Sequence, residues 1–177
     1  MDHAKDDILL WESFRNGDRD AFATLFQRHY DGLCRYGGKF VDNPSLVEDS
    51  IQELFIEIWQ SKSRIPVASI RAYLLKSLKY KLLKTYRQRR RFLPIGDGHS
   101  AFEWSHEDQL IAVERDAENS RKVLNALDRL SNRQKEIVYL KYFQNLSYEE
   151  ISEVMNINYQ VARNLLYQAI KSLRTLL

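Results

Sequence analysis

The sequence predicts an all-α protein: two small helical domains joined by an acidic linker, the second domain containing a helix-turn-helix. Three observations predict this fold. The 177 residues include only three prolines and six glycines. Apolar residues recur with the 3.6-residue period of a helix over long stretches. Positive and negative charges fall in separate blocks, and a chain of this length allows one large domain or two small ones.

Four helices are expected in the first domain, residues 1–92. The first starts near Asp7 and stops at Gly17, and Asp18 can cap the second, which weakens at Gly37 and Gly38. Ser45 and Glu48 have the spacing of a capping box, which predicts the start of a third helix. The apolar residues expected to face inward from these three helices include Ile8, Leu9, Trp11, Phe14, Phe22, Leu25, Phe26, Leu33, Phe40, Val47, Ile51, Leu54, Phe55, Ile58 and Trp59.

The fourth helix carries the strongest charge signal in the chain. Ser69 can cap it, and its apolar positions repeat every four residues at Ile70, Leu74, Leu78, Leu82 and Tyr86. Its buried side is therefore expected to be apolar, with the cations facing outward. Residues 62–91 hold eleven basic residues and no acid, together with Tyr73 and Tyr80. Cations neutralise phosphates and flat rings stack on unpaired bases, so this helix is expected to bind a nucleic-acid strand. The alternative is a solvated, lysine-rich face.

Residues 93–117 are expected to form the linker. They hold Pro94, Gly96 and Gly98, and residues 97–118 carry seven acids against one base. A connection this long is uncommon inside a compact domain, which favours a boundary here. Phe102 and Trp104 lie within it, and the sequence leaves open whether they dock on a partner or patch one of the domains.

The second domain, residues 118–177, ends in the helix-turn-helix. Ser131 can cap one helix, and Ser147 with Glu150 forms a capping box that starts a short one. A turn at residues 155–157 follows, where Asn156 tolerates the left-handed conformation. The last helix begins near Tyr159, and its expected inward stripe is Val161, Leu165, Ala169 and Leu173.

A recognition helix presents hydrogen-bonding side chains to the major groove from its N-terminal half. Asn and Gln can pair with adenine and Arg with guanine. The residues that fit this requirement are Asn158, Tyr159, Gln160, Arg163, Asn164 and Tyr167, while Lys171 and Arg174 are better placed for phosphate or solvent. The alternative is a plain helical hairpin with a polar face.

Other classes of function find no support in the sequence. Cys34 is the only cysteine, and the four histidines show no metal-ligand spacing, so no metal site is expected. There is no glycine-rich phosphate loop and no nucleophile–base motif, so neither a cofactor nor an enzyme activity is expected. No apolar run approaches a membrane span, and a cytoplasmic location is expected.

Three segments carry a resemblance that covers almost the whole chain. They are EDSIQELFIEIW (48–59), AYLLKSLKYKLLKTYRQRRR (72–91), and LSYEEISEVMNINYQVARNLLYQAIKSLR (146–174), the last preceded by LDRLSNRQKEIVYLKYF. In this order and separation they resemble the extracytoplasmic-function (ECF) group of bacterial RNA polymerase sigma factors. The first is similar to region 2.2 of that family, the second to regions 2.3 and 2.4, and the third to region 4.2 after a region 4.1.

The resemblance implies a role for each segment. Residues matching the site where region 2.2 docks on the polymerase β′ clamp are Asp49, Gln52 and Glu53. Residues implied to hold the melted −10 strand are Lys62, Arg64, Arg71, Tyr73, Lys76, Lys79, Tyr80, Lys84 and Arg87. Residues implied to contact the −35 duplex are Arg133, Asn158, Tyr159, Gln160, Arg163, Asn164, Tyr167 and Lys171. The linker would thread toward the RNA exit path.

The resemblance also implies the partners: core RNA polymerase through its β′ clamp and β flap, promoter DNA, and, as in many members, an anti-sigma factor. The chain departs from the family at several positions. Tyr80 and Lys84 stand where many members have Asn and Asp, and Gln160, Ala162, Arg163 and Asn164 stand where Thr, Lys, Ser and Arg are common. The −10 and −35 preferences of other members therefore do not transfer to this chain.

Two other functions remain open at this point. The first is an autonomous helix-turn-helix regulator, with the N-terminal half as a dimerisation or effector domain. The second is a protein–protein adaptor. Aromatic residues among the cations of residues 62–91 favour the sigma factor over the first, because a duplex binder has little use for them. The polar recognition helix argues against the second.

Overall fold

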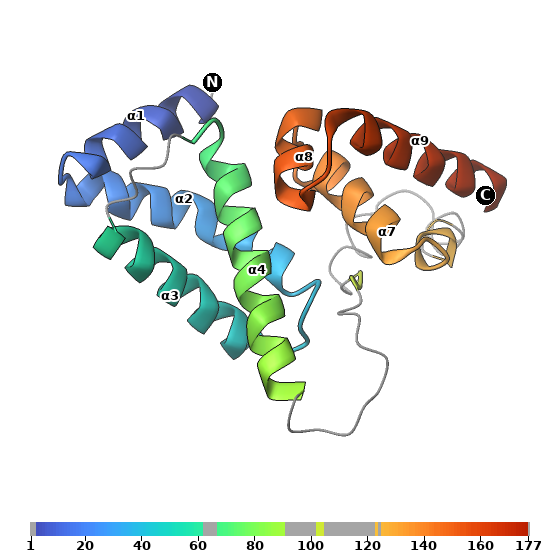
Figure 1. Ribbon diagram of the computed structural model, residues 1–177, viewed down its shortest axis with the longest axis horizontal. Helices are drawn as coiled ribbons and strands as arrows, with labels where there is room; N and C mark the ends of the chain where they lie inside the picture. The colour runs from blue at the N-terminus through green and yellow to red at the C-terminus, as the bar shows by residue number, and fades with distance from the viewer. Residues whose placement is uncertain (1–2, 62–66, 91–101, 105–122, 124, 177) are drawn as a thin grey trace. The chain divides into compact units, whose positions relative to one another are not determined.

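The computed structural model describes residues 3–61, 67–90, 102–104, 123 and 125–176. All regular structure in these residues is helical, which confirms the predicted all-α fold. The chain divides into two compact units, residues 1–100 and residues 101–177 (Figure 1). Among the described helices, none combines the length and the apolar character that a membrane span requires.

Within its described residues, the first unit is a bundle of α1 (His3–Arg15), α2 (Arg19–Gly37), α3 (Pro44–Ser61) and α4 (Ile70–Arg90). Helices α2 and α4 each contact the other three, and Figure 1 shows α4, in green, running beside α2 and α3. The core is the set of apolar stripes that these helices turn toward one another, including Phe14, Leu25, Leu33, Tyr36, Ile51, Leu54, Ile58, Leu74, Leu78 and Leu82.

Local capping explains where these helices begin. The Asp18 carboxylate accepts hydrogen bonds from the backbone N–H groups of Asp20 and Ala21, at 2.9 and 3.1 Å, and Gly17 before it has φ +100°. Ser69 Oγ accepts from the Ala72 N–H at 3.2 Å. Both caps agree with the sequence, because each satisfies a donor that the first helical turn leaves without a partner.

The predicted capping box at Ser45 and Glu48 is wrong. Helix α3 begins at Pro44, and the side chain of Asn43 accepts a hydrogen bond from the Leu46 N–H at 3.0 Å. Proline is favoured as the first helical residue because its φ is already helical and its missing N–H would have no partner there. Asn43 therefore caps the helix two residues before the predicted position.

In α1 the predicted apolar residues divide into two groups. Trp11 and Phe14 are buried, whereas Ile8 is 37% and Leu9 62% exposed. Buried Asp7 links α1 to α2: its carboxylate lies 2.6 Å from Nη1 of Arg28, whose side chain is 32% exposed, and 2.9 Å from Nε2 of buried His29. Burial lowers the pKa of His29, Asp7 acts in the opposite direction, and Arg71 and Arg28 lower it further.

The second unit contains α7 (Asn132–Val138), a single π-helical turn η1 (Tyr139–Phe143), α8 (Tyr148–Met155) and α9 (Tyr159–Leu176). Residues 125–128 before them are also helical. The predicted caps are confirmed: Ser131 pairs with Gln134, and Ser147 with Glu150, each as a reciprocal capping box. Between α8 and α9, Asn156 adopts the left-handed conformation at φ 52° and ψ 52°.

The π turn η1 is a feature that the sequence analysis does not anticipate. The Gln144 N–H donates to the Tyr139 carbonyl, five residues earlier, at 3.0 Å, and Gln144 Nε2 donates to the buried Tyr139 hydroxyl at 3.1 Å. This wider turn shifts the helical register by one residue. As a result Tyr139 and Leu140 are buried, and Tyr142 is 61% exposed.

Phe102 and Trp104 belong to the core of the second unit. They are 1% and 9% exposed, and both rings contact Tyr139, at centroid distances of 5.6 and 6.0 Å. Trp104 also lies 5.2 Å from Phe143. Of the two alternatives that the sequence left open, these residues therefore patch a domain. Apart from residues 102–104, the expected linker lies outside the described residues.

Candidate polymerase-docking and nucleic-acid interfaces

The predicted docking face lies on the outer side of α3. Asp49, Gln52 and Glu53 are all exposed, because the 3.6-residue period turns Ile51, Leu54 and Ile58 inward. Of the three, Glu53 has a partner within the unit: its Oε2 lies 3.1 Å from Lys81 Nζ on α4. The structure thus brings the three predicted residues together on one helix surface.

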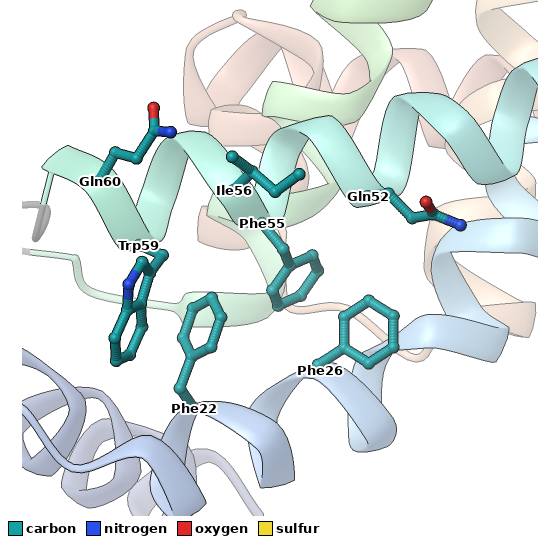
Figure 2. A pocket seen from close by; sticks show the side chains of 7 residues that line it. All are labelled: Phe22, Phe26, Gln52, Phe55, Ile56, Trp59 and Gln60. Atoms are coloured by element: carbon teal, nitrogen blue, oxygen red, sulfur yellow. The ribbon is translucent and has the colours of Figure 1, made fainter.

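An apolar hollow of about 350 Å³ adjoins this face and shares Gln52 with it. Figure 2 shows Phe55 and Trp59 of α3 pointing toward Phe22 and Phe26 of α2, with ring centroids 4.9–5.6 Å apart. Ile56, 54% exposed, and Gln60 complete the lining. Sequence analysis missed this hollow, although an isoleucine between Gln52 and Glu57, out of phase with the buried stripe, is the signal that could have indicated it.

The basic and aromatic residues predicted to bind a strand on α4 differ in how far they are exposed. Tyr80 is 52% exposed and Lys84 is exposed, while Lys76 and Lys79 are half-buried. Lys79 Nζ lies 5.7 Å from the centroid of the Phe40 ring. Arg71 is half-buried at the start of the helix. Of the other predicted strand-binding residues, Lys62 and Arg64 and the side chain of Arg87 lie outside the described part of the chain.

Tyr73 contributes to packing as well as to this face. Its ring meets the ring of buried Trp11 edge-on at 5.7 Å, and the side chain is half-buried. The contact fastens α4 to α1. Part of the Tyr73 ring is therefore in contact with Trp11, whereas Tyr80 is 52% exposed to solvent.

Lys81 lies in the basic helix but faces the acids of α3. Its Nζ is 2.7 Å from Glu57 Oε1 and 3.1 Å from Glu53 Oε2. Burial lowers the pKa of Lys81, but hydrogen bonds to Glu57 and Glu53 outweigh burial, and the pKa is raised above its ordinary value. The sequence analysis expected the cations of this helix to face outward, and for Lys81 that expectation is wrong because α3 supplies acids opposite it.

The candidate interface for duplex DNA is the N-terminal half of α9. Tyr159, Gln160, Arg163 and Asn164 are exposed there, and Tyr167, one turn further on, is 69% exposed. Gln160 Nε2 donates to Asn164 Oδ1 at 3.1 Å. Asn158 is the helix cap, since its Oδ1 accepts from the Val161 N–H at 2.8 Å. The amide nitrogen of Asn158 is the part of this side chain that the cap does not use.

The predicted inward stripe of α9 is confirmed at Ala169 but wrong by one residue in the two turns before it. The buried positions are Ala162, Leu166 and Ala169, and Val161 is 43% exposed. The small Ala162, at 0% exposure, lets α9 approach its neighbours closely. Val161 therefore joins the polar residues on the exposed surface. Arg133, in the first turn of α7, and Lys171, late in α9, are both exposed as predicted.

Comparisons with known proteins agree with this arrangement. The family model described as Sigma-70 region 2 matches residues 25–92, and that described as Sigma-70, region 4 matches residues 120–173. Together they cover more than half of the chain. The chain belongs to the sigma-70 family of RNA polymerase sigma factors, in its ECF group. It is thus a transcription initiation factor that directs promoter-specific transcription by RNA polymerase, and the autonomous regulator is not favoured.

Individual relatives extend the match along the chain. The RNA polymerase sigma factor CarQ of Myxococcus xanthus is 27% identical over 171 residues, which cover 94% of each chain. The ECF RNA polymerase sigma factor SigK of Mycobacterium ulcerans is 25% identical over 180 residues, covering 97% of this chain and 94% of the relative.

Two solved structures share the fold. CnrH, in complex with the cytosolic domain of CnrY, aligns with a TM-score of 0.64 at 19% identity over 96% of each chain. The sigma factor RpoE of Bartonella quintana, in complex with the anti-sigma factor NepR, aligns with a TM-score of 0.58 at 17% identity over 88% of this chain and 95% of that one.

Among the described residues, no group of three His, Cys, Asp or Glu side chains could hold a metal ion.

Proposed function

We propose that this sigma factor divides its work between its two ends. Residues 1–92 dock on the β′ clamp of core RNA polymerase through α3 and capture the melted −10 strand on α4. Residues 118–177, with Phe102 and Trp104 packed into the same unit, read the −35 element as duplex through α9, and the rest of residues 93–117 connects the two parts. The protein itself catalyses no reaction and acts in the cytoplasm, where its polymerase and promoter partners are.

Capture of the melted strand is supported by the position of the exposed Tyr80 ring between two lysines on α4. Lys76, Tyr80 and Lys84 are four residues apart and so share one face of α4, with Tyr80 52% exposed between them. A ring flanked by ammonium groups can stack on a base while the cations meet the phosphates on either side. Such stacking contributes about 1–3 kcal/mol per base, enough to offset the cost of unpairing it.

The support for duplex reading is the separation of faces on α9. Ala162, Leu166 and Ala169 anchor the helix from behind, so that Gln160, Arg163 and Asn164 stay exposed near its N-terminus. The amide and guanidinium groups can pair with adenine and guanine edges in the major groove.

An anti-sigma factor is part of the proposal. The neighbour RpoE was solved in complex with the anti-sigma factor NepR, and CnrH was solved in complex with the cytosolic domain of CnrY. A protein of this kind would hold the factor inactive by covering the faces that polymerase uses.

Fluorescence-detected promoter opening tests the strand-capture step directly. Core polymerase and a pool of promoter fragments are mixed with the wild-type factor, Tyr80→Phe or Tyr80→Ala. We expect opening only when both proteins are present, retained opening with Tyr80→Phe, and a loss of about ten-fold or more with Tyr80→Ala. Equal losses of binding to closed and to pre-melted promoters with Tyr80→Ala would contradict capture by stacking.

Docking through α3 has its own test. Replacing Asp49, Gln52 and Glu53 together with Ala should weaken binding to core polymerase. Glu57→Ala is the matched control, because Glu57 is as exposed as Glu53, at 65% against 66% for the side chain, and pairs with the same Lys81. If the control weakens binding as much as the triple variant, general acidity of α3 explains docking better than this face.

A further inference from the structure

A ladder of four side chains, two aromatic rings between two cations, runs through the second unit and ends at Arg163. Arg163 Cζ lies 5.9 Å from the centroid of the Tyr159 ring, and that ring meets the ring of Tyr148 edge-on at 5.7 Å. At the other end, Lys141 Nζ lies 5.0 Å from the Tyr148 centroid. The four residues come from three successive elements, η1, α8 and α9.

Both ends of this ladder are placed by the backbone. Lys141 Nζ donates to the Leu146 carbonyl at 3.1 Å, which fixes the ammonium over Tyr148, the first residue of α8. Tyr159 is the first residue of α9, and Arg163 follows four residues later on the same face. Each aromatic ring therefore stands at the start of a helix, where capping by Ser147 or Asn158 holds the backbone.

This arrangement changes the role that the sequence suggests for Tyr159. The Arg163 guanidinium lies near one side of the Tyr159 ring and Tyr148 meets the ring edge-on, while Tyr159 stays 44% exposed. A guanidinium over a ring is attracted by the ring's quadrupole. An arginine side chain otherwise loses much rotamer freedom when it must hold one geometry to pair with a base.

We propose that Tyr159 is a positioning residue that holds Arg163 for a guanine at one base pair of the −35 element, with Tyr148 and Lys141 supporting the ring from behind. The ring limits the guanidinium to one flank of α9, so that its paired N–H groups reach a single base edge. This proposal rests on the proposed reading of the −35 duplex by α9. Tyr159 acts on base preference through Arg163 and makes no base contact of its own.

The experiment is a double-mutant cycle on the whole factor bound to core polymerase, read out on promoters with a randomised −35 element. The variants are Tyr159→Phe, Tyr159→Ala, Arg163→Ala and the double variant with both alanines. Arg163→Ala should lose the preference for guanine at one position. Tyr159→Ala should weaken that same preference by about two- to five-fold, as expected for loss of an exposed cation–π contact, while Tyr159→Phe keeps it.

In the Arg163→Ala background, replacing Tyr159 with Ala should change nothing further at that position. The cycle separates the positioning role of Tyr159 from the proposed reading of the −35 duplex by α9. If Arg163→Ala alters no base preference, duplex reading by this part of α9 fails. If Arg163→Ala has its effect but Tyr159→Ala changes a base preference by the same factor with and without Arg163, Tyr159 contacts DNA itself and the positioning role is overturned. Partial unfolding would weaken all sequences uniformly and leave the preference ratio unmoved, so it mimics neither result.

Discussion

Lys81 on α4 and Glu57 on α3 form an ion pair with 2.7 Å between Nζ and Oε1, and Glu53 joins it at 3.1 Å. The basic helix and the acidic face are thus connected at one ammonium group. A lysine within the basic stretch of residues 62–91 is therefore not always free to bind phosphate. Lys81 serves the packing of α4 on α3, and it places Glu53 within the proposed docking face.

We therefore expect Lys81 and Lys84 to differ in their effect on the salt dependence of DNA binding. Lys84 is exposed, whereas Lys81 faces two carboxylates. Lys84→Ala should reduce the slope of log binding constant against log salt concentration by about 0.7 for a lost single-strand phosphate contact. Lys81→Ala should leave that slope unchanged. The measurement is binding of the polymerase–factor complex to a pre-melted promoter between low and physiological salt; equal slopes for the two variants would contradict the assignment.

The buried histidine predicts a pH dependence of stability. Because burial lowers the pKa of His29 in the folded protein, the unfolded chain binds a proton more readily in the window below the ordinary value of about 6.5. The contribution of neutral His29 to the free energy of unfolding is therefore complete above pH 6.5, the ordinary pKa of histidine. It falls as the pH drops toward the folded pKa, by at most about 1.4 kcal/mol per pH unit.

Urea unfolding between pH 5 and 7.5 measures this dependence, and NMR titration of the imidazole gives the His29 pKa directly. His29→Gln removes the titrating group while keeping a polar side chain beside Asp7, which lies 2.9 Å from Nε2 in the native protein. The slope in this window should be shallower in the variant. An unchanged slope, or an imidazole that titrates above 6.5, would show that the ion pair with Asp7 outweighs burial.

The features predictable from sequence are those that a few neighbouring residues decide. The caps at Asp18, Ser131 and Ser147 are of this kind, as is the left-handed turn at Asn156. Each depends on a side chain that satisfies or relaxes the backbone two or three residues away. The error at Ser45 has the same local origin, because Asn43 followed by Pro44 offered a competing start that the capping-box spacing obscured.

The features that escaped prediction depend on what lies across the bundle. Whether Val161 or Ala162 is buried is a matter of helix phase, and only the packing of α9 on its neighbours decides it. Likewise, Lys81 differs from Lys84 only through the acids on α3. Tyr139, at the start of the π turn, is packed against the rings of Phe102 and Trp104, more than thirty residues earlier. Helical periodicity carries no information about such partners.

Those two rings predict a stability effect outside the region 4 family match, which begins at residue 120. Phe102 and Trp104 are 1% and 9% exposed against Tyr139. Replacing either with Ala should destabilise the second unit by about 3–5 kcal/mol, as for other buried aromatic truncations. Tyr142→Ala, at a site that is 61% exposed, should cost little. Thermal unfolding of the three variants checks this ranking; a harmless Phe102→Ala would mean that the core closes without it.

Adjacent glycines at the end of α2 predict opposite outcomes for the same substitution. A Cβ built on Gly37 would lie 2.5 Å from Val47 Cγ1 and 3.3 Å from Leu82 Cδ1. Val47 is 2% exposed, and its branched side chain is confined to few rotamers, so it cannot move aside without disturbing the core. A Cβ on Gly38 would meet only backbone oxygens, the nearer being that of Cys34 at 3.4 Å, and Gly38 already has the helical φ of −61°.

Gly37→Ala should therefore destabilise the first unit by about 1–3 kcal/mol through overpacking between α2, α3 and α4. Gly38→Ala should be neutral or stabilise it by up to about 1 kcal/mol, because alanine restricts the unfolded chain at no steric cost in the folded one. Chemical denaturation of the two variants beside the wild type measures the difference. The comparison isolates the close approach of helices, since both changes add the same methyl group one residue apart. Equal effects would mean that Val47 yields to the new methyl group and that α3 is not held tightly against α2.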